Sequence, residues 1–142
     1  MLNPNKIILA YSGNNTGIMK TVYDTYKKKN GQIISVNYKK FAKTQNNYVY
    51  DTLVERQNKL VDLGNAYLIL PGGLGTVYEL FQVLVKNNIN DFRKKIYILN
   101  IYGFFDDLLT YITKLNKNKF ISNGIESMNM FISNNPIIIY NE

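Results

Sequence analysis

The sequence contains neither cysteine nor histidine. The absence of cysteine excludes disulfide bonds and thiol nucleophiles, and the absence of both residue types excludes zinc sites of the Cys/His kind. A histidine general base of the Ser–His–Asp type is excluded as well. Any acid–base chemistry must therefore use Asp, Glu, Lys, Tyr or a bound water.

Long apolar runs are also missing, because none approaches the roughly 18–20 residues that span a bilayer. The apolar stretch Lys6–Tyr11 is followed at once by a turn containing Gly and Asn, so no leader peptide is predicted. We therefore expect a cytoplasmic protein with no membrane segment.

The net charge is +7, from 17 basic and 10 acidic residues. Most of the basic residues are lysines scattered along the chain, which is typical of a solvated surface. The same charge would attract anionic ligands such as nucleotides or nucleic acids. Nucleic-acid binding is the least favoured hypothesis, because the basic residues form no compact patch in the sequence and no recognition motif is present.

The chain has 142 residues, of which 46% are hydrophobic and 19% charged, so we expect one globular domain over residues 1–142. Short apolar runs predict five strands, and apolar residues at helical spacing predict four helices. The predicted strands are Lys6–Tyr11, Gln32–Asn37, Ala66–Leu70, Lys95–Asn100 and Ser127–Ile132. The predicted helices are Gly17–Lys29, Asp51–Leu63 with Asp51 as N-cap, Thr76–Lys86 and Asp106–Leu115. A loop is predicted over Lys39–Tyr50, and the tail Ile137–Tyr140 fits either a strand or a helical turn.

Strands and helices alternate along the whole chain. The strands are short and lack strict polar–apolar alternation, which indicates burial on both faces. This pattern predicts an α/β fold of the Rossmann-like kind, with a doubly wound parallel sheet between two layers of helices.

Two glycine-containing turns follow the first and third predicted strands. They are Ser12–Gly17 (SGNNTG) and Pro71–Thr76 (PGGLGT). In such folds ligands bind beyond the carboxyl ends of the strands. Glycine lets the backbone approach a phosphate closely, and the N–H groups at the start of a helix donate to it. The first turn is a common structural turn, whereas three glycines within four positions in the second turn indicate close backbone approach.

Two polar residues near these turns have structural interpretations as well as functional ones. Thr76-Val77-Tyr78-Glu79 fits a capping box, in which Thr and Glu satisfy the first N–H groups of a helix. By spacing alone this structural role of Glu79 is favoured. Arg56, on the preceding helix, is by itself typical of a surface or salt-bridge residue.

The segment Pro71–Glu79 (PGGLGTVYE) resembles the PGGxGTxxE signature of the Lonely Guy (LOG) family, once described as lysine decarboxylase-like. Three further segments are similar to family motifs in the same order. Glu55-Arg56 matches a Glu-Arg-Lys segment in which Gln57 replaces the lysine. Tyr11–Met19 is similar to a glycine-rich YGGGSxGLMG turn, and Asn100–Leu109 to Asn-x-x-Gly-Phe-Tyr-Asp-x-Leu-Leu.

The resemblance implies a Rossmann-like fold, a homodimer and hydrolysis of the N-glycosidic bond of nucleoside 5′-monophosphates, with no metal or redox cofactor. The small-molecule substrate would be AMP or a cytokinin ribotide. Arg56 and Glu79 match the catalytic pair of the family. The residues expected to hold the 5′-phosphate are Ser12, Gly13, Gly72, Gly73, Gly75 and Thr76. Met19 would line the base pocket, although a core methionine is an equal interpretation.

The chain also departs from the family pattern. It is shorter than typical members, Gln57 removes a charge beside Arg56, and Asn14 and Asn15 replace smaller residues of the first turn. A binding module or sensor for a nucleotide-derived ligand is therefore a second hypothesis. An amino-acid decarboxylase is not favoured, because no lysine lies in a recognisable Schiff-base motif.

Overall fold

The computed structural model describes residue 3 and residues 5–13, 16–41, 47–89 and 92–135. The chain divides into two compact units, Met1–Gly64 and Asn65–Glu142. Each unit is described by itself below, as unit 1 and unit 2. The predicted strand or turn at residues 137–140 lies outside the described residues.

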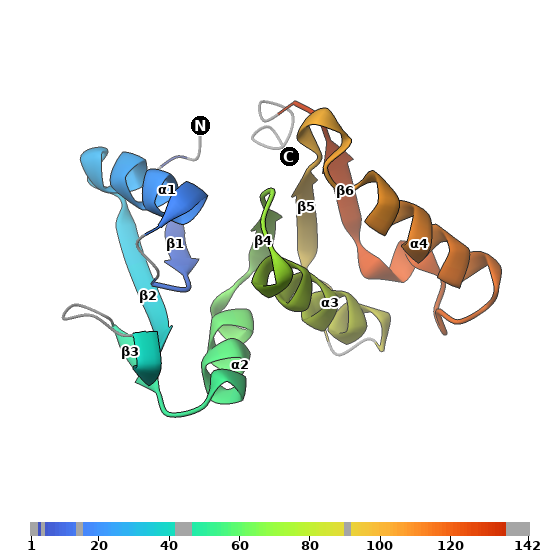
Figure 1. Cartoon of the computed structure of the whole chain (residues 1–142), viewed down its shortest axis with the longest axis horizontal. Coiled ribbons are helices and arrows are strands. Elements are labelled where there is room, and N and C mark those ends of the chain that lie inside the picture. Colours follow the sequence, from blue (N-terminus) through green and yellow to red (C-terminus); the bar gives the residue numbers. More distant parts are fainter. Residues whose placement is uncertain (1–2, 4, 14–15, 42–46, 90–91, 136–142) are drawn as a thin grey trace. The chain divides into compact units, whose positions relative to one another are not determined.

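Unit 1 contains a parallel sheet in the order β1-β2-β3 (Figure 1). Its elements are β1 (Ile8–Tyr11), α1 (Gly17–Lys28), β2 (Gln32–Tyr38), the 3-10 helix η1 (Lys39–Phe41), β3 (Tyr48–Tyr50) and α2 (Leu53–Leu63). Three consecutive residues of β2, Ser35, Val36 and Asn37, are buried. Successive side chains of a strand point to opposite faces, so both faces of this sheet are covered at its central strand.

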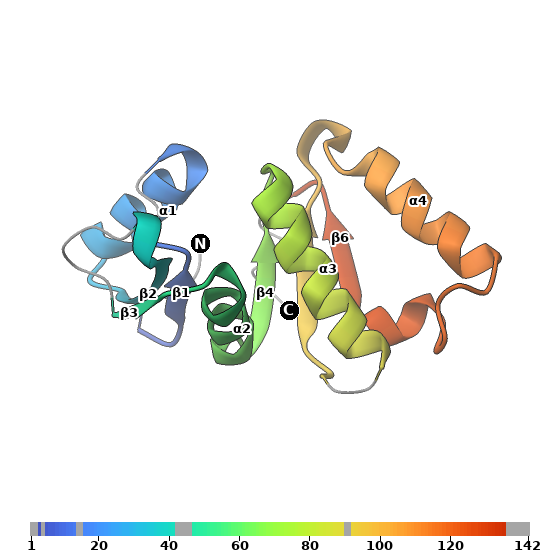
Figure 2. The same cartoon turned by 60° about the horizontal axis from the view of Figure 1, so that its bottom comes forward.

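Unit 2 contains a second parallel sheet, in the order β4-β5-β6. Its elements are β4 (Ala66–Ile69), α3 (Leu74–Asn88), β5 (Lys95–Leu99), the 3-10 helix η2 (Ile101–Gly103), α4 (Asp106–Lys117), the 3-10 helix η3 (Ile125–Met128) and β6 (Met130–Ser133). The strand order advances in one direction, and right-handed crossovers place α3 and α4 on the same face of the sheet. Figure 2 shows α3 in front of these strands.

The core of unit 2 lies between α3 and the sheet. Leu80, Val83, Leu84 and Asn87 are buried on α3 at the i, i+3, i+4, i+7 spacing of an amphipathic helix. The Asn87 side chain donates hydrogen bonds to the carbonyl oxygens of Lys94 (2.8 Å) and Met128 (2.7 Å), so this buried amide ties the helix to the chain segments around it.

These observations confirm the predicted α/β class, because both units hold parallel strands flanked by helices, as in a three-layer Rossmann-like fold. The single domain over residues 1–142 stays a prediction. Within the described residues, no helix is long and apolar enough to cross a membrane.

Three element predictions were wrong. The loop over Lys39–Tyr50 contains η1 and the short strand β3, whose three residues are too few to show a periodic pattern. The last strand begins at Met130 rather than Ser127, because Ser127 lies in η3 and donates to the Gly124 carbonyl oxygen (2.6 Å). The N-cap of α2 is Thr52 and not Asp51.

Candidate functional site

The turn between β4 and α3 in unit 2 holds most of the predicted phosphate-binding residues. The helix begins at Leu74, two residues before the predicted start, with Gly73 as its N-cap. The N–H groups of Thr76 (3.0 Å) and Val77 (3.2 Å) donate to the Gly73 carbonyl oxygen and so fix this start. The predicted capping box of Thr76 and Glu79 was therefore wrong, because Thr76 lies within the first turn of the helix.

The three glycines of this turn have different surroundings. A Cβ atom added to Gly72 would lie 2.2 Å from the Thr76 hydroxyl oxygen, so the fold itself requires glycine there. A Cβ atom on Gly73 or Gly75 would meet no heavy atom within 4 Å. The packing of the chain thus gives no reason for glycine at these two positions. Gly73 is the N-cap, where glycine is well accepted. Gly75 lies inside the helix, where glycine is unfavourable by about 1 kcal/mol relative to alanine.

The start of α3 can accept an anion. The first N–H groups of an α-helix have no acceptor within the helix, and Gly73 provides no side-chain cap. The positive end of the helix dipole lies at the same place. Thr76 and Glu79 are three residues apart on α3, and Gly75 and Glu79 four apart, so all three share one face of the helix. A phosphate at this turn would lie about one helical turn from Glu79.

The loop after β5 reaches the same edge of the unit 2 sheet, because β4 and β5 are parallel neighbours. Its Asn100 side chain accepts a hydrogen bond from the Phe105 N–H (2.7 Å) and donates one to the Asp106 carboxylate (2.7 Å). Gly103 has φ +69°, and a Cβ atom there would lie 2.4 Å from that carboxylate. The Asn100–Asp106 motif therefore fixes the shape of this loop.

The turn after β1 in unit 1 brings Ser12 and Met19 together. Ser12 is buried, and its hydroxyl donates to the Met19 sulfur (2.9 Å), while Met19 itself remains partly exposed at the start of α1. Gly13 has φ +74° and Gly17 φ +56°, so glycine serves the left-handed backbone of this turn. Residues 14 and 15 lie outside the described part of the chain.

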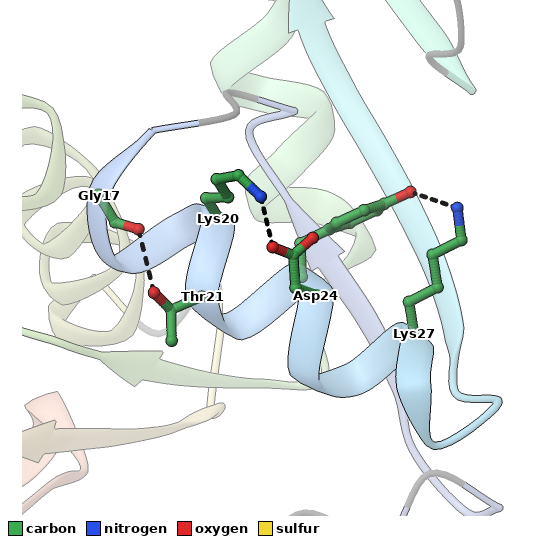
Figure 3. Close-up of polar contacts among 6 residues, drawn as sticks. Gly17, Lys20, Thr21, Asp24 and Lys27 are labelled. Carbon is green, nitrogen blue, oxygen red and sulfur yellow. Dashed lines mark hydrogen bonds and ion pairs between the residues drawn. The ribbon is translucent and has the colours of Figure 1, made fainter.

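The helix α1 continues from this turn. Its polar side chains pair along the helix, with Thr21 donating to the Gly17 carbonyl oxygen (3.4 Å) and Lys20 pairing with Asp24 (Figure 3). The ring of Tyr11, at the end of β1, lies 5.6 Å from the ring of Tyr23. Burial, with the nearby Tyr23 and Asp24, raises the pKa of Tyr11, so this phenol stays protonated near neutral pH.

The predicted catalytic residue Arg56 lies on α2 of unit 1. It is only 8% exposed, so its guanidinium is part of the interior rather than a surface charge. Its Nε donates to the Val36 carbonyl oxygen of β2 (3.3 Å), and one terminal nitrogen donates to the Gln57 side-chain oxygen. The start of this helix is fixed by a capping box, in which the side-chain oxygens of Thr52 and Glu55 each accept a hydrogen bond from the other residue's backbone N–H.

The predicted site residues thus form two groups. Unit 1 holds Ser12, Gly13, Met19 and Arg56, of which Ser12 and Met19 are in contact. Unit 2 holds the glycine turn with Thr76 and Glu79 on one helix. Sequence reasoning missed the hydrogen bond between Arg56 and Gln57, because it treated Gln57 only as a lost charge.

The acidic side chains are the only ones in this chain that could form a metal site of the common kinds, because it has no Cys or His. Within residue ranges 5–13, 16–41, 47–89 and 92–135, no group of three or more Asp or Glu side chains could hold a metal ion.

Comparison with known proteins identifies the family. The family model described as "Possible lysine decarboxylase" matches residues 1–141. The chain belongs to this family. It is the family called LOG above, and the match over nearly the whole chain confirms the resemblance first seen in Pro71–Glu79.

Several curated members of the LOG family are similar to this chain. The cytokinin riboside 5′-monophosphate phosphoribohydrolase of Rhodococcoides fascians is 28% identical over 131 residues, which cover 86% of this chain and 66% of the relative. A relative with the same descriptive name in Arabidopsis thaliana is 25% identical over 140 residues, which cover 94% of this chain and 66% of the relative. Another in Mycobacterium marinum is 34% identical over 74 residues, which cover 52% of this chain and 40% of the relative. The chain spans 66% or less of the length of these three relatives.

Proposed function

We propose that this chain hydrolyses the N-glycosidic bond of a nucleoside 5′-monophosphate, either AMP or a cytokinin ribotide. The products would be the free base and ribose 5-phosphate. Support comes from the family membership and from relatives named as phosphoribohydrolases of a cytokinin riboside 5′-monophosphate. The net charge of +7 favours an anionic substrate of this kind.

The observation that carries this proposal is the start of α3. Gly73 and Gly75 leave open space beside the first N–H groups of the helix, and the N-cap residue Gly73 has no side chain to cap them, which suits a phosphate. Glu79 shares the helix face of Gly75 and Thr76. A phosphate-binding turn and a carboxylate therefore belong to one rigid element.

We assign the residues as follows. The 5′-phosphate is held by the backbone of Gly72, Gly73 and Gly75 and by Thr76, with Ser12 and Gly13 contributing from the first turn. Arg56 and Glu79 form the catalytic pair, and Met19 lines the base pocket. In this assignment Arg56 orients Glu79 or the leaving base.

The proposed reaction places Glu79 beside the ribose. As the bond between C1′ and the base nitrogen lengthens, positive charge develops on the sugar, as in other glycosidic cleavages. A carboxylate at this position stabilises that charge and orients the attacking water. The water oxygen then bonds to C1′ and gives up one proton, the bond from C1′ to the base nitrogen breaks, and that nitrogen gains one proton. No step in this reaction needs a metal or redox cofactor.

The proposal extends to the wider setting of the protein. We infer that residues 1–142 act as a single domain, that the active form is a homodimer, and that the protein works in the cytoplasm. A cytokinin ribotide as substrate would make the reaction a cytokinin activation. These inferences rest on the LOG family resemblance.

The test is chromatography of the purified protein after incubation with AMP, other nucleoside monophosphates and isopentenyladenosine monophosphate. We expect free base from the wild type and a loss of at least about 100-fold in Glu79→Gln, since that change removes the charge but keeps the shape. The matched control is Asp24→Asn, because Asp24 is about half exposed and pairs with Lys20 at 2.5 Å on the helix surface (Figure 3). Such an exposed pair contributes little, so the control should keep full activity.

Two outcomes would contradict the proposal. Undiminished turnover in Glu79→Gln would remove Glu79 from the mechanism. The absence of free base from every nucleotide would reject hydrolysis. The binding-module hypothesis would then be favoured. It predicts that calorimetry detects binding of a nucleotide or an ADP-ribose-type ligand, which stays intact.

A further inference from the structure

Gln57 is the most deeply buried polar side chain beside the proposed catalytic residue. Its exposed fraction is 0%, and that of Arg56 is 8%. The two residues are adjacent on α2, and the Gln57 side-chain oxygen accepts a hydrogen bond from a terminal nitrogen of Arg56. The Arg56 Nε donates to the Val36 carbonyl oxygen, 3.3 Å away on β2. Two acceptors thus engage two different nitrogens of one planar guanidinium.

The chemistry of the contact fixes the orientation of the Gln57 amide. An arginine side chain has only donors, so the partner atom must be the amide oxygen rather than the amide nitrogen. The Gln57 nitrogen then points elsewhere, and among the described residues it has no hydrogen-bond partner. Turning the amide over would oppose two donors and would leave the oxygen without its bond to Arg56.

A fully buried amide with an unpaired nitrogen destabilises the folded state, because that nitrogen has left water without gaining an acceptor. An apolar side chain of similar size would avoid this penalty. The contact with Arg56 is what an apolar residue could not supply. An amide oxygen also differs from a carboxylate, because it orients a guanidinium without neutralising its positive charge.

We propose that Gln57 is a positioning residue that holds the Arg56 guanidinium in one orientation without neutralising its positive charge. This inference rests on the proposed function, since it assigns Arg56 to that reaction. It gives Gln57 a function at a position where the family resemblance indicates only that a lysine has been replaced.

Two variants separate orientation from charge. Gln57→Met removes the unpaired nitrogen, which stabilises the fold, but also the acceptor of Arg56, which destabilises it, so the net change in stability should be small. The value of kcat should fall about 10-fold to 100-fold. Gln57→Glu keeps an oxygen acceptor but adds a negative charge, so its main effect should be on KM, raised by about 10-fold. Gln32→Met, the same change at an exposed position of β2, should match the wild type in both constants.

Coupling to Arg56 is measured by the double variant. If Gln57 acts through Arg56, then Gln57→Met should lower kcat much less in an Arg56→Lys protein than in the wild type. Equal losses in both proteins would overturn the proposal, as would a Gln57→Met protein with wild-type kcat. An unchanged KM in Gln57→Glu would overturn the part that concerns charge.

A second readout does not depend on turnover. The chain contains two arginines, Arg56 and Arg93, so the side-chain N–H signals in an NMR spectrum are assigned with Arg93→Lys alone. A held guanidinium rotates slowly and gives separate signals for its terminal nitrogens. We expect separate Arg56 signals in the wild type and in Gln57→Glu, and averaged signals in Gln57→Met. A wild type without turnover would reject the proposed function, whereas unchanged Arg56 signals in Gln57→Met would reject the role of Gln57.

Discussion

The two glycine turns of this protein use glycine for different reasons. After β1, Gly13 and Gly17 have φ values of +74° and +56°, so the path of the backbone itself requires them. After β4, Gly73 has an ordinary φ of −88°, and neither it nor Gly75 would bring a Cβ atom within 4 Å of another heavy atom. Gly73 is the N-cap of α3, but Gly75 lies inside the helix, so the second turn contains a glycine that neither packing nor backbone geometry explains.

This difference indicates where a ligand belongs. A glycine demanded by backbone geometry says nothing about binding, because the turn would need it with or without a ligand. A glycine with room for a side chain marks space that another molecule can use. By this reasoning the start of α3 is the stronger candidate for a phosphate site, and the turn after β1 has a mainly structural role in which Ser12 contacts Met19.

The largest effect expected from this comparison is on activity, through Gly75→Ala. The helical position accepts alanine without contact, so the free energy of unfolding should rise by up to about 1 kcal/mol. The added methyl group would occupy the space of the phosphate, so KM should increase about 10-fold or more. Thermal unfolding and steady-state kinetics on the same sample measure both quantities. A stabilised protein with unchanged KM would show that the open space at Gly75 is not the phosphate site.

Much of the fold could be predicted from the sequence, because the strands and helices of the core carry strong apolar patterns. β1, β4 and β5 lie within predicted apolar runs, β2 extends one residue beyond its run to Tyr38, and each predicted helix exists. β3 was missed because three mostly exposed residues leave no periodic signal. The start of α3 was misplaced because Thr76 and Glu79 fit a capping box, whereas the backbone bonds to Gly73 begin the helix earlier.

The candidate site was predictable only in part. The PGGLGT turn and Glu79 are visible as a local motif, since they lie on one turn and one helix. The contact of Arg56 with Gln57 was not predictable, because adjacent residues of a helix are not expected to face each other. The contact of Ser12 with Met19 depends on the left-handed turn between them, which sequence spacing does not specify.

A smaller effect is expected on stability, through the glycines that the fold does require. Gly17→Ala places a side chain at φ +56° in open space, so strain alone should lower the free energy of unfolding by about 1–2 kcal/mol. Gly72→Ala meets the Thr76 hydroxyl at 2.2 Å and should cost about 1–3 kcal/mol by crowding. Chemical denaturation measures both. Gly17→Asn should recover part of the first loss, because asparagine tolerates this backbone region, and an equal loss for both residues would argue against strain.

The smallest effect compares the two helix starts that contain a threonine. Thr52 is the N-cap of α2, and its hydroxyl accepts a hydrogen bond from the Glu55 N–H at 3.2 Å. Thr52→Ala should therefore lower the free energy of unfolding by about 1 kcal/mol. Thr76 lies inside the first turn of α3, where Gly73 is the N-cap, so Thr76→Ala should show no loss of a cap and should act on KM through the phosphate site. If Thr76→Ala instead lowers the free energy of unfolding by as much as Thr52→Ala and leaves KM unchanged, Thr76 acts as a cap, and the contrast between the two helix starts is wrong.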